Sequence, residues 1–440
     1  MRQWARVGCA GAVAVVAIIG LTQTATFGAK AAAPGDNEEI YEELELFEHA
    51  LSIVRSDYVE EPKAKDLIYG ALKGMLAVLD PYSQFLDPDS YNELKVDTEG
   101  EFGGLGIEIT IRDDLLTVIA PIDDTPAYHA GLMPQDRIVK IDGELTRGIT
   151  LLEAVKKLRG KPGTTVALTI FRDGETELKE VTLERAVITI QSVREASLLE
   201  DRIGYIRLSD FREKTTDDLA AALATLKAQE VDSLILDLRN NPGGLLDVAV
   251  SVAELFLGRN QLVVTTKGRL RNQNQELHTR INGPANELPL VVLINEGSAS
   301  ASEIVAGAIQ DHHRGIILGT KSHGKASVQT IFPLTDGSAL RLTTSAYFTP
   351  SGRSIHGQGI QPDVEVPFER PVKEAKAQTN GEDVFERVEA EPAPGEKPPA
   401  GLTERKRSDN QLARAIDLLK GIKVYQAEGR ARVQGKARLY

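Results

Sequence analysis

Residues 290–303 read LVVLINEGSASASE and contain the clearest strand-to-helix transition of the chain. The first five residues are apolar, which predicts a buried strand, and the segment Ser300–Gln310 beyond the small residues has helical character. A strand that runs through small residues into a helix leaves a hydroxyl beside unpaired backbone N–H groups, which can hold a developing oxyanion. Ser298, Ser300 and Ser302 are therefore candidate acyl-transfer nucleophiles. The pattern alone does not separate them, and a serine-rich helix N-cap with close packing is the structural alternative.

Strand and helix patterns alternate on both sides of this stretch. The strand runs are 203–208, 233–238, 290–294 and 315–318, and the helical stretches are 216–228, 246–257 and 300–310. Such alternation predicts an α/β layered core, which we place at residues 188–370. Residues 98–187 instead hold short strands broken by glycine, including 103–109, with helical character only at 125–130 and 151–158. They predict a small, mostly β domain inserted ahead of the core.

Helices are predicted before these two domains, in residues 34–97. A first helix at 38–58 carries an apolar stripe among acidic residues, and a second at 64–79 stops before Pro81. The stripe needs a partner. That partner is either the rest of the chain or the same helix of a second copy, which would make a homodimer.

The C-terminal part of the chain changes composition. Residues 371–402 are rich in Pro, Glu, Lys and Ala and have no apolar period, which indicates a linker. Residues 403–440 are predicted to contain one helix, Asn410–Leu419, which ends at Gly421 and is followed by a polar tail. The sequence assigns no role to this helix.

The N-terminal 33 residues have the order of an export signal. Two arginines precede the apolar run Val7–Leu21, and small residues follow up to Ala33. The run is short for the ~20 residues of a membrane span, which favours cleavage near Ala33 over a permanent anchor. We therefore expect an extracytoplasmic protein, periplasmic in a cell with two membranes. It would be soluble after cleavage, and membrane-associated through the N-terminal segment otherwise.

Charge and cysteine content exclude several classes of protein. The formal net charge of −13 makes nucleic acid a poor partner. The chain's one cysteine, Cys9, lies in the predicted signal. An intrachain disulfide, a cysteine nucleophile in the folded part and a cysteine-rich zinc site are therefore excluded.

A serine nucleophile needs a base, and Lys325 is the better candidate. The chain's histidines fall in no motif that links them to a serine: His49, His129, His278, His312, His313, His323 and His356. Lys325 stands between Gly324 and Ala326, small residues that allow it to be desolvated until it is neutral. At the ordinary lysine pKa of ~10.4 only about one side chain in 2,500 is neutral at pH 7, so the site has to lower that pKa.

Three segments together resemble the active-site motifs of the carboxyl-terminal processing peptidases, also called tail-specific proteases. They are Ser298-Ala299-Ser300-Ala301-Ser302-Glu303, Gly324-Lys325-Ala326-Ser327-Val328-Gln329 and Arg239-Asn240-Asn241-Pro242-Gly243-Gly244. The resemblance covers residues 38–368. It implies a crotonase-like layered ββα core, serine peptidase activity, and neither cofactor nor metal.

The resemblance also assigns roles to residues. It makes Ser300 the nucleophile, Lys325 the general base and Gln329 the residue that orients Lys325, with Ser298 and Ser302 as supports. The oxyanion hole would be formed by the backbone N–H of Ala301 with that of Gly243 or Gly244, and the sequence does not separate the two glycines. From its own residues, the glycine pair is equally compatible with a tight turn.

The small β domain resembles a PDZ domain. The resemblance makes Gly104, Leu105, Gly106 and Ile107 the carboxylate-binding loop, and residues 130–138 the second signature. In that signature Gln135 stands where glycine is usual. PDZ domains add a ligand strand and hold its terminal carboxylate on backbone N–H groups. The implied partners are protein or peptide substrates with free C-termini.

Two other functions are compatible with parts of the sequence. A CoA-thioester enzyme of the crotonase type would share the core and the glycine turn, but it would need neither Ser300 nor Lys325. A non-catalytic envelope scaffold would use only the PDZ-like domain, and the presence of Ser300, Lys325 and Gln329 speaks against it.

Overall fold

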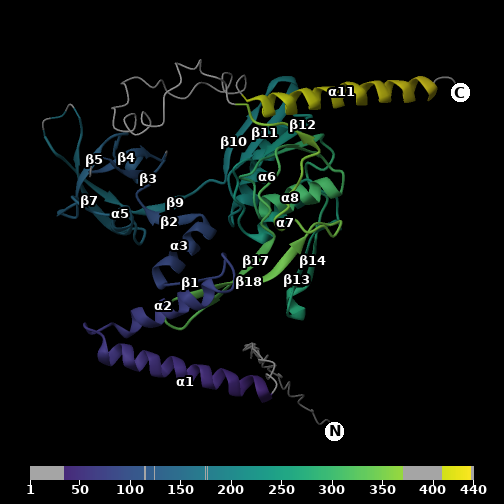
Figure 1. The fold of residues 1–440 in the computed structure, drawn as a ribbon. Helices are drawn as coiled ribbons and strands as arrows, with labels where there is room; N and C mark the ends of the chain where they lie inside the picture. Colours follow the sequence, from purple (N-terminus) through teal and green to yellow (C-terminus); the bar gives the residue numbers. More distant parts are fainter. Residues whose placement is uncertain are drawn as a thin grey trace, which may run out of the picture. The chain divides into compact units, whose positions relative to one another are not determined.

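The computed structural model describes residues 34–112, 115–122, 124–173, 175, 177–369 and 409–437 (Figure 1). The predicted export signal at 1–33 and the predicted linker at 371–402 lie outside the described residues. The chain divides into two units, Met1–Ala71 and Leu72–Tyr440.

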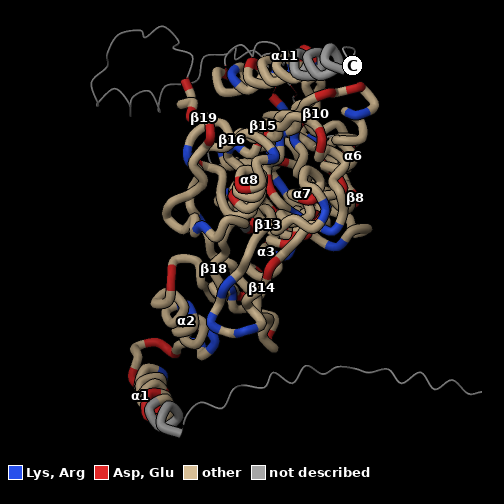
Figure 2. The backbone as a smooth tube through the Cα atoms, turned by 90° about the vertical axis from the view of Figure 1, so that its right-hand side faces the viewer, with Lys and Arg blue, Asp and Glu red and all other residues tan. Residues whose placement is uncertain are grey.

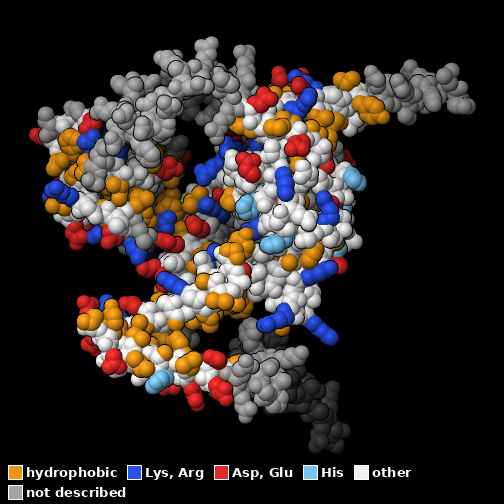
Figure 3. Space-filling model, in the orientation of Figure 1, with side chains coloured by type: hydrophobic (Ala, Val, Ile, Leu, Met, Phe, Trp, Pro, Cys, Tyr) orange, Lys and Arg blue, Asp and Glu red, His pale blue; other side chains and the backbone are white. Residues whose placement is uncertain are grey.

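The N-terminal helix α1 spans Pro34–Asp57, and the predicted apolar stripe is exposed to solvent. Five side chains of the stripe are 41 to 60% exposed: Ile40, Leu44, Phe47, Val54 and Tyr58. Figure 3 shows hydrophobic side chains among the acidic ones of this helix. Within the unit Met1–Ala71, the described residues do not cover this stripe.

Three elements lead from α1 to the small β domain: α2 (Ala64–Ala77), β1 (Gln84–Leu86) and α3 (Pro88–Glu99). After α2, the Asp80 carboxylate accepts hydrogen bonds from the N–H groups of Tyr82 and Ser83, at 2.7 and 2.8 Å. The sequence pattern does not predict α3. Its start is nevertheless marked, because Asp87 accepts a hydrogen bond from the Ser90 N–H at 2.9 Å, as a helix N-cap does.

The small β domain has a six-stranded antiparallel sheet and a core of its own. Its elements are β3 (Ile107–Arg112), β4 (Leu115–Pro121), α4 (Pro126–His129), β5 (Arg137–Ile141), β6 (Glu144–Leu145), α5 (Leu151–Leu158), β7 (Thr165–Phe171) and β8 (Lys179–Glu184). β2 (Glu101–Gly104) and β9 (Ala186–Thr189) pair where the chain enters and leaves the domain. The run expected at 103–109 is therefore two strands, which separate at Leu105 and Gly106.

The layered core is built on a second six-stranded sheet, with strand order β10-β11-β12-β15-β16-β19. The strands are β10 (Val193–Leu198), β11 (Ile203–Leu208), β12 (Ser233–Asp237), β15 (Leu290–Ile294), β16 (Ile316–Gly319) and β19 (Val364–Glu365). A 3₁₀ turn at Glu200–Arg202 precedes β11. Only the β10-β11 pair is antiparallel in this sheet, so the carboxyl ends of the other strands meet at one edge.

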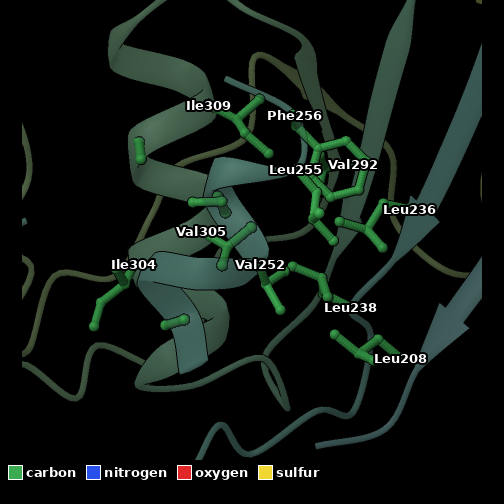
Figure 4. Packing of buried hydrophobic residues seen from close by; sticks show 14 of the residues in the cluster. Leu208, Leu236, Leu238, Val252, Leu255, Phe256, Val292, Ile304, Val305 and Ile309 are labelled. Carbon is green, nitrogen blue, oxygen red and sulfur yellow. The ribbon is translucent and has the colours of Figure 1, made fainter. Parts of the chain in front are cut away.

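Helices cover both faces of this sheet. They are α6 (Thr215–Ala228), α7 (Leu246–Glu254) and α8 (Ala301–Asp311) on one face, and α11 (Asn410–Ala437) on the other (Figures 1 and 2). Val305 of α8 packs with Leu236 and Val292 (Figure 4). Ile416 of α11 packs in a separate cluster with Ile235. Neighbouring residues of β12 thus point to opposite faces, as strand geometry requires.

A five-stranded antiparallel sheet completes the core, with β1-β18-β13-β14 in order and β17 paired to β18. Its further strands are β13 (Leu262–Gly268), β14 (Gln275–His278), β17 (Ser327–Pro333) and β18 (Ala339–Phe348), with a 3₁₀ turn at Arg271–Gln273. β17 begins two residues after Lys325, and β18 carries Tyr347.

The structure confirms the layered α/β core, the mostly β domain and the N-terminal helices. It corrects the end of the C-terminal helix, because α11 continues past Gly421 to Ala437. Glycine in a helix interior costs only ~1 kcal/mol. Beyond Gly421, Ile422 still packs against the apolar cluster that Ile235 and Ile416 form on the α11 face of the sheet, here called the outer apolar cluster. Lys423 also forms an ion pair with Asp232, so contacts with the core outweigh that cost.

Candidate active site

Ser300 occupies the junction between β15 and α8, immediately before the helix. Its φ of 54° and ψ of −113° are uncommon for a residue other than glycine, a strain of order 1–3 kcal/mol that surrounding contacts have to hold. Ser298 Oγ donates to Leu238 O at 2.8 Å, and Ser302 Oγ donates to Asn241 O at 2.9 Å. Both hydroxyls are thus engaged with the turn after β12, and Ser300 is the serine of the three that lines a cavity.

This cavity, of about 650 Å³, brings the predicted catalytic residues together. Ser300, Lys325, Gln329 and the pair Gly243-Gly244 all line it, and α3 supplies part of the wall. Ala301 is buried directly behind Ser300, at the first position of α8. A peptide in the cavity would therefore meet a hydroxyl, an amine and backbone N–H groups.

Position 243 requires glycine because its backbone lies against the segment that carries Ser300. Its φ is 99°, and a Cβ at this position would lie 2.7 Å from Ala299 O and 2.8 Å from both Ala301 N and Ser300 Cβ. No other residue fits there without moving backbone atoms. The turn after β12 thereby presents its backbone directly to the candidate nucleophile.

The hydrogen bonds of the turn distinguish the two glycines. The Gly243 N–H donates to Asn241 Oδ1 at 2.9 Å. On the other side of the turn, Phe211 N donates to Gly243 O and Leu245 N donates to Phe211 O, which makes a parallel bridge across Gly244. Among the described residues, the Gly244 N–H itself donates no hydrogen bond. Gly244 is therefore the better candidate for the second oxyanion donor beside Ala301.

Lys325 lies in the segment between β16 and β17, and burial lowers its pKa. The positive charge of Arg341, which lines the same cavity, lowers that pKa further. The Lys325 Nζ lies 4.8 Å from the centroid of the Tyr82 ring. Among the residues that the structure describes, no hydrogen bond joins Lys325 Nζ to Ser300 Oγ. Burial and Arg341 therefore make the neutral amine easier to form than in a free lysine, and the amine lies over the Tyr82 ring rather than against the Ser300 hydroxyl.

Among the described residues, Gln329 forms no hydrogen bond with Lys325. It follows a bulge in β17, and its amide donates to Ser327 Oγ at 2.9 Å and to Thr343 Oγ1 at 3.4 Å. Its predicted role, orienting Lys325, requires a different arrangement of this side chain.

Glu303 was missed as a functional residue by the sequence analysis, although it stands in the quoted motif. Its carboxylate is fully buried and accepts hydrogen bonds from the backbone N–H of both Ser300 and Lys325, at 2.8 and 2.9 Å. It also accepts from Gly324 N at 2.7 Å and Ser322 Oγ at 2.5 Å. One side chain therefore holds the main chain of both the candidate nucleophile and the candidate base. The spacing of serine and glutamate at a helix start, a capping-box pattern, was the available signal.

Tyr347 of β18 is a second residue that the sequence analysis missed. Its hydroxyl donates to Lys325 O and is also hydrogen-bonded to the Ser300 side chain. Burial, and then the charge of Glu303, raise the pKa of Tyr347 well above its usual value, more than the bond to Ser300 lowers it. Tyr347 therefore stays a neutral donor beside the two candidate catalytic residues.

The predicted carboxylate loop lies along a smaller cavity of the β domain. Gly104, Leu105, Gly106 and Ile107 line it, and α5 forms the opposite wall. A Cβ on Gly106, whose φ is 73°, would lie 2.3 Å from the side chain of Thr125, so the loop needs glycine here. In the second signature, Gln135 adopts a φ of 75°, the left-handed conformation that the usual glycine would take.

No group of three or more His, Cys, Asp and Glu side chains in the described part of the chain is arranged to hold a metal ion. None of the helices in the described ranges is long and apolar enough to cross a membrane.

Three sequence profiles of known families match the chain. Peptidase family S41 matches residues 202–366, the PDZ domain matches 103–183, and the activating protease CtpB N-terminal domain matches 6–90.

Individual proteins resemble most of the chain. It is 46% identical over 343 residues to a carboxy-terminal-processing protease of Bartonella bacilliformis, which covers 77% of this chain and 78% of that protein. It is 33% identical over 362 residues to the carboxy-terminal processing protease CtpB of Bacillus subtilis, covering 82% and 75%. A solved structure, the photosystem II D1 C-terminal processing protease, is 32% identical, covers 72% of this chain and 86% of its own, and has a TM-score of 0.42.

Proposed function

The chain belongs to the carboxyl-terminal processing proteases of peptidase family S41, and on this premise we propose that it is an exported endopeptidase that cleaves with Ser300 and Lys325. It is a serine peptidase with a PDZ domain, and its substrates are proteins or peptides. The observation that carries the proposed chemistry is the cavity where Ser300, the half-buried Lys325 and the Gly243-Gly244 turn meet.

The chemical steps follow from these groups. Neutral Lys325 takes the proton of Ser300 Oγ while that oxygen attacks the peptide carbonyl carbon. The N–H groups of Ala301 and Gly244 stabilise the negative oxygen of the tetrahedral intermediate. The C–N bond then breaks, and the Lys325 ammonium protonates the leaving amine. Water, deprotonated by Lys325, hydrolyses the acyl-enzyme and restores Ser300.

These steps require Lys325 to leave the Tyr82 ring and reach Ser300 Oγ. The four-carbon stem of lysine allows this change, and catalytic hydrogen bonds often tighten only when substrate is bound. In that arrangement Gln329 would exchange its bond to Ser327 for one that orients Lys325. Degradation of an unstructured protein with an apolar C-terminus tests the proposal, since Ser300→Ala should abolish it.

The PDZ domain is proposed to select substrates by their free C-terminal end. Backbone N–H groups of the loop Gly104–Ile107 would hold the terminal carboxylate, which a C-terminal amide lacks. A peptide with a free acid should therefore be cut faster than the matched amide. Equal rates for the two peptides with the intact enzyme would remove the case for C-terminal recognition.

Deletion of residues 98–187 separates two versions of this selection. If the domain only tethers the substrate, the deletion variant should cut the free acid as slowly as wild type cuts the amide. If the domain also obstructs the cavity, the variant should cut the amide faster than wild type does, which would indicate a two-state coupling between tail binding and access.

Export and localisation are proposed from the N-terminal 33 residues. The protein would act outside the cytoplasm, in the periplasm of a cell with two membranes, and the N-terminal segment would associate with the membrane if it is retained. The mass of the N-terminal peptide from the native protein, isolated from soluble and membrane fractions, distinguishes cleavage near Ala33 from retention.

A homodimer through α1 is proposed from its exposed apolar stripe. Side chains such as Leu44 and Phe47 are exposed, and a second copy of the helix would cover them. Sedimentation should show a dimer for wild type and a monomer for Leu44→Glu. Glu45→Gln, a change at an exposed acidic position of the same helix, should keep the dimer.

A further inference from the structure

A buried ionic cluster joins the C-terminal segment to the turn that carries the oxyanion glycines. At its centre the Arg239 guanidinium lies between two carboxylates. Arg239 Nε donates to Asp237 Oδ1 at 3.0 Å, and a terminal nitrogen donates to Asp237 Oδ2 at 2.6 Å. The terminal nitrogens also donate to both Asp409 oxygens, at 3.0 and 2.8 Å, and to Gln411 Oε1 at 2.9 Å.

The cluster is shielded from water. The side chain of Arg239 is 12% exposed, that of Asp237 1% and that of Asp409 21%. Burial acts to raise the pKa of Asp409, but the hydrogen bonds and charge of Arg239 outweigh it and lower that pKa. An ion pair in such a place is weakened little by solvent, and removing one partner leaves a buried charge short of compensation.

Asp409 and Gln411 belong to the start of α11, which is itself firmly attached to the core. Asp409 caps the helix by accepting from Leu412 N at 3.0 Å, and Gln411 Nε2 donates to Val366 O at 2.7 Å. Leu412 and Ile416 pack in the outer apolar cluster. The helix therefore holds the Asp409 carboxylate in a fixed position beside the Arg239 guanidinium.

Arg239 opens the turn whose later residues face Ser300. The next residue, Asn240, has a φ of 57°, a left-handed conformation that costs free energy for a residue other than glycine. Contacts on two sides maintain the conformation of this turn. On the α8 side, the Ser302 hydroxyl donates a hydrogen bond to Asn241 O. On the α11 side, Arg239 is bound by the Asp409 carboxylate.

We propose that the segment beginning at Asp409 is a positioning element of the active site, which acts through Arg239 on the turn that presents the Gly243-Gly244 backbone to Ser300. This inference rests on the proposed function. Asp409 touches no substrate in this account. It sets the geometry of the oxyanion donors, and its loss should therefore weaken binding of the transition state more than binding of the substrate.

The test compares Asp409→Asn and Asp409→Ala with a matched control, Asp417→Asn, in full-length protein. Asp417 is an exposed carboxylate on the same helix. Loss of an oxyanion donor costs about 10²–10³-fold in kcat, and a displaced donor should cost about tenfold or more. Both Asp409 variants should lose kcat by that factor with KM within about threefold of wild type. A peptidyl boronate, which mimics the tetrahedral intermediate, should bind more weakly by a similar factor.

A role in fold stability alone predicts a different result. The assays are run at least 10 °C below each variant's Tm, where a purely stabilising cluster would leave kcat and boronate affinity unchanged. If Asp409→Ala does not fold, Asp409→Asn keeps the test decisive, because it retains side-chain volume and an acceptor. An Asp409→Asn enzyme with kcat and boronate affinity within twofold of wild type would overturn the inference. Absence of Ser300-dependent cleavage by wild type would instead overturn the proposed function.

Discussion

Replacing Glu303 with glutamine should displace the main chain of Ser300 and Lys325, the proposed nucleophile and base, without changing either residue. The carboxylate accepts at one oxygen from the N–H groups of Ser300 and Lys325, and at the other from Gly324 N and the Ser322 hydroxyl. Glutamine keeps one acceptor oxygen and replaces the other with an NH₂ donor. The NH₂ should replace the oxygen that faces Gly324 N and the Ser322 hydroxyl. The Ser322 hydroxyl can rotate to accept a hydrogen bond from the NH₂, whereas the two backbone N–H groups at the other oxygen can only donate.

The cost follows from the bonds that change. The Gly324 N–H would face a donor, and a buried unpaired N–H costs about 1–3 kcal/mol. The remaining hydrogen bonds become weaker because their acceptor is no longer charged. Part of this loss in stability is offset, because the folded protein no longer buries a charged carboxylate. We expect the free energy of unfolding to fall by about 2 kcal/mol, which corresponds to a Tm decrease of about 4–8 °C. Because small displacements of reacting groups can cost ~10²-fold in rate, kcat should fall at least tenfold.

Thermal unfolding and peptide cleavage, both on the Glu303→Gln enzyme, measure these two effects. Glu287→Gln is the control, since Glu287 is exposed and its replacement should change neither quantity. A Glu303→Gln enzyme with wild-type kcat and a Tm within 1 °C of wild type would refute the idea that this carboxylate holds the main chain of Ser300 and Lys325.

Two further variants test other parts of the site. Because burial and Arg341 lower the pKa of Lys325, the neutral base accumulates as pH rises through a value below the ordinary ~10.4, and the rate should rise along that limb. Lys325→Arg should be inactive from pH 6 to 10, since guanidinium stays protonated, and full activity would show that only a positive charge is needed there. Gly243→Ala should lose at least about 10²-fold in kcat, because its methyl would displace the oxyanion turn. Gly421→Ala, where a Cβ meets nothing within 4 Å, should keep wild-type kcat, and equal losses in both would indicate a general loss of fold.

Much of the fold follows from apolar patterns. The buried strands at 203–208 and 290–294 have the bounds that the sequence predicts, because runs rich in apolar residues end at the polar Ser209 and Asn295. α3 was missed because it buries none of its side chains fully, so it has no apolar period to detect. The end of α11 was misplaced because the stop signal at Gly421 is local, whereas Ile422 and Lys423 are held by contacts with residues distant in sequence.

The candidate site divides in the same way. A hydroxyl at a strand-to-helix junction could be predicted from the residues, but the choice of Ser300 needed either the family motifs or the observation that Ser298 and Ser302 bind the neighbouring turn. Glu303 was overlooked because a charged residue at a helix start is usually exposed, and its full burial depends on donors supplied by a segment some twenty residues later in the chain. Pairing of Arg239 with Asp409, across 170 residues, leaves no local signal at all.

The mass of the enzyme during turnover of a peptide ester tests whether Ser300 forms an acyl-enzyme with Lys325 as its base. In the proposed mechanism Ser300 Oγ displaces the alcohol and carries the acyl group, so a rapid acid quench should trap a protein heavier by one acyl group. Fragmentation should place that group on Ser300, Ser300→Ala should gain no mass, and Lys325→Ala should acylate at least about 10²-fold more slowly while remaining folded. An acyl group on another residue, or ester turnover by Ser300→Ala at the wild-type rate, would contradict the Ser300/Lys325 mechanism.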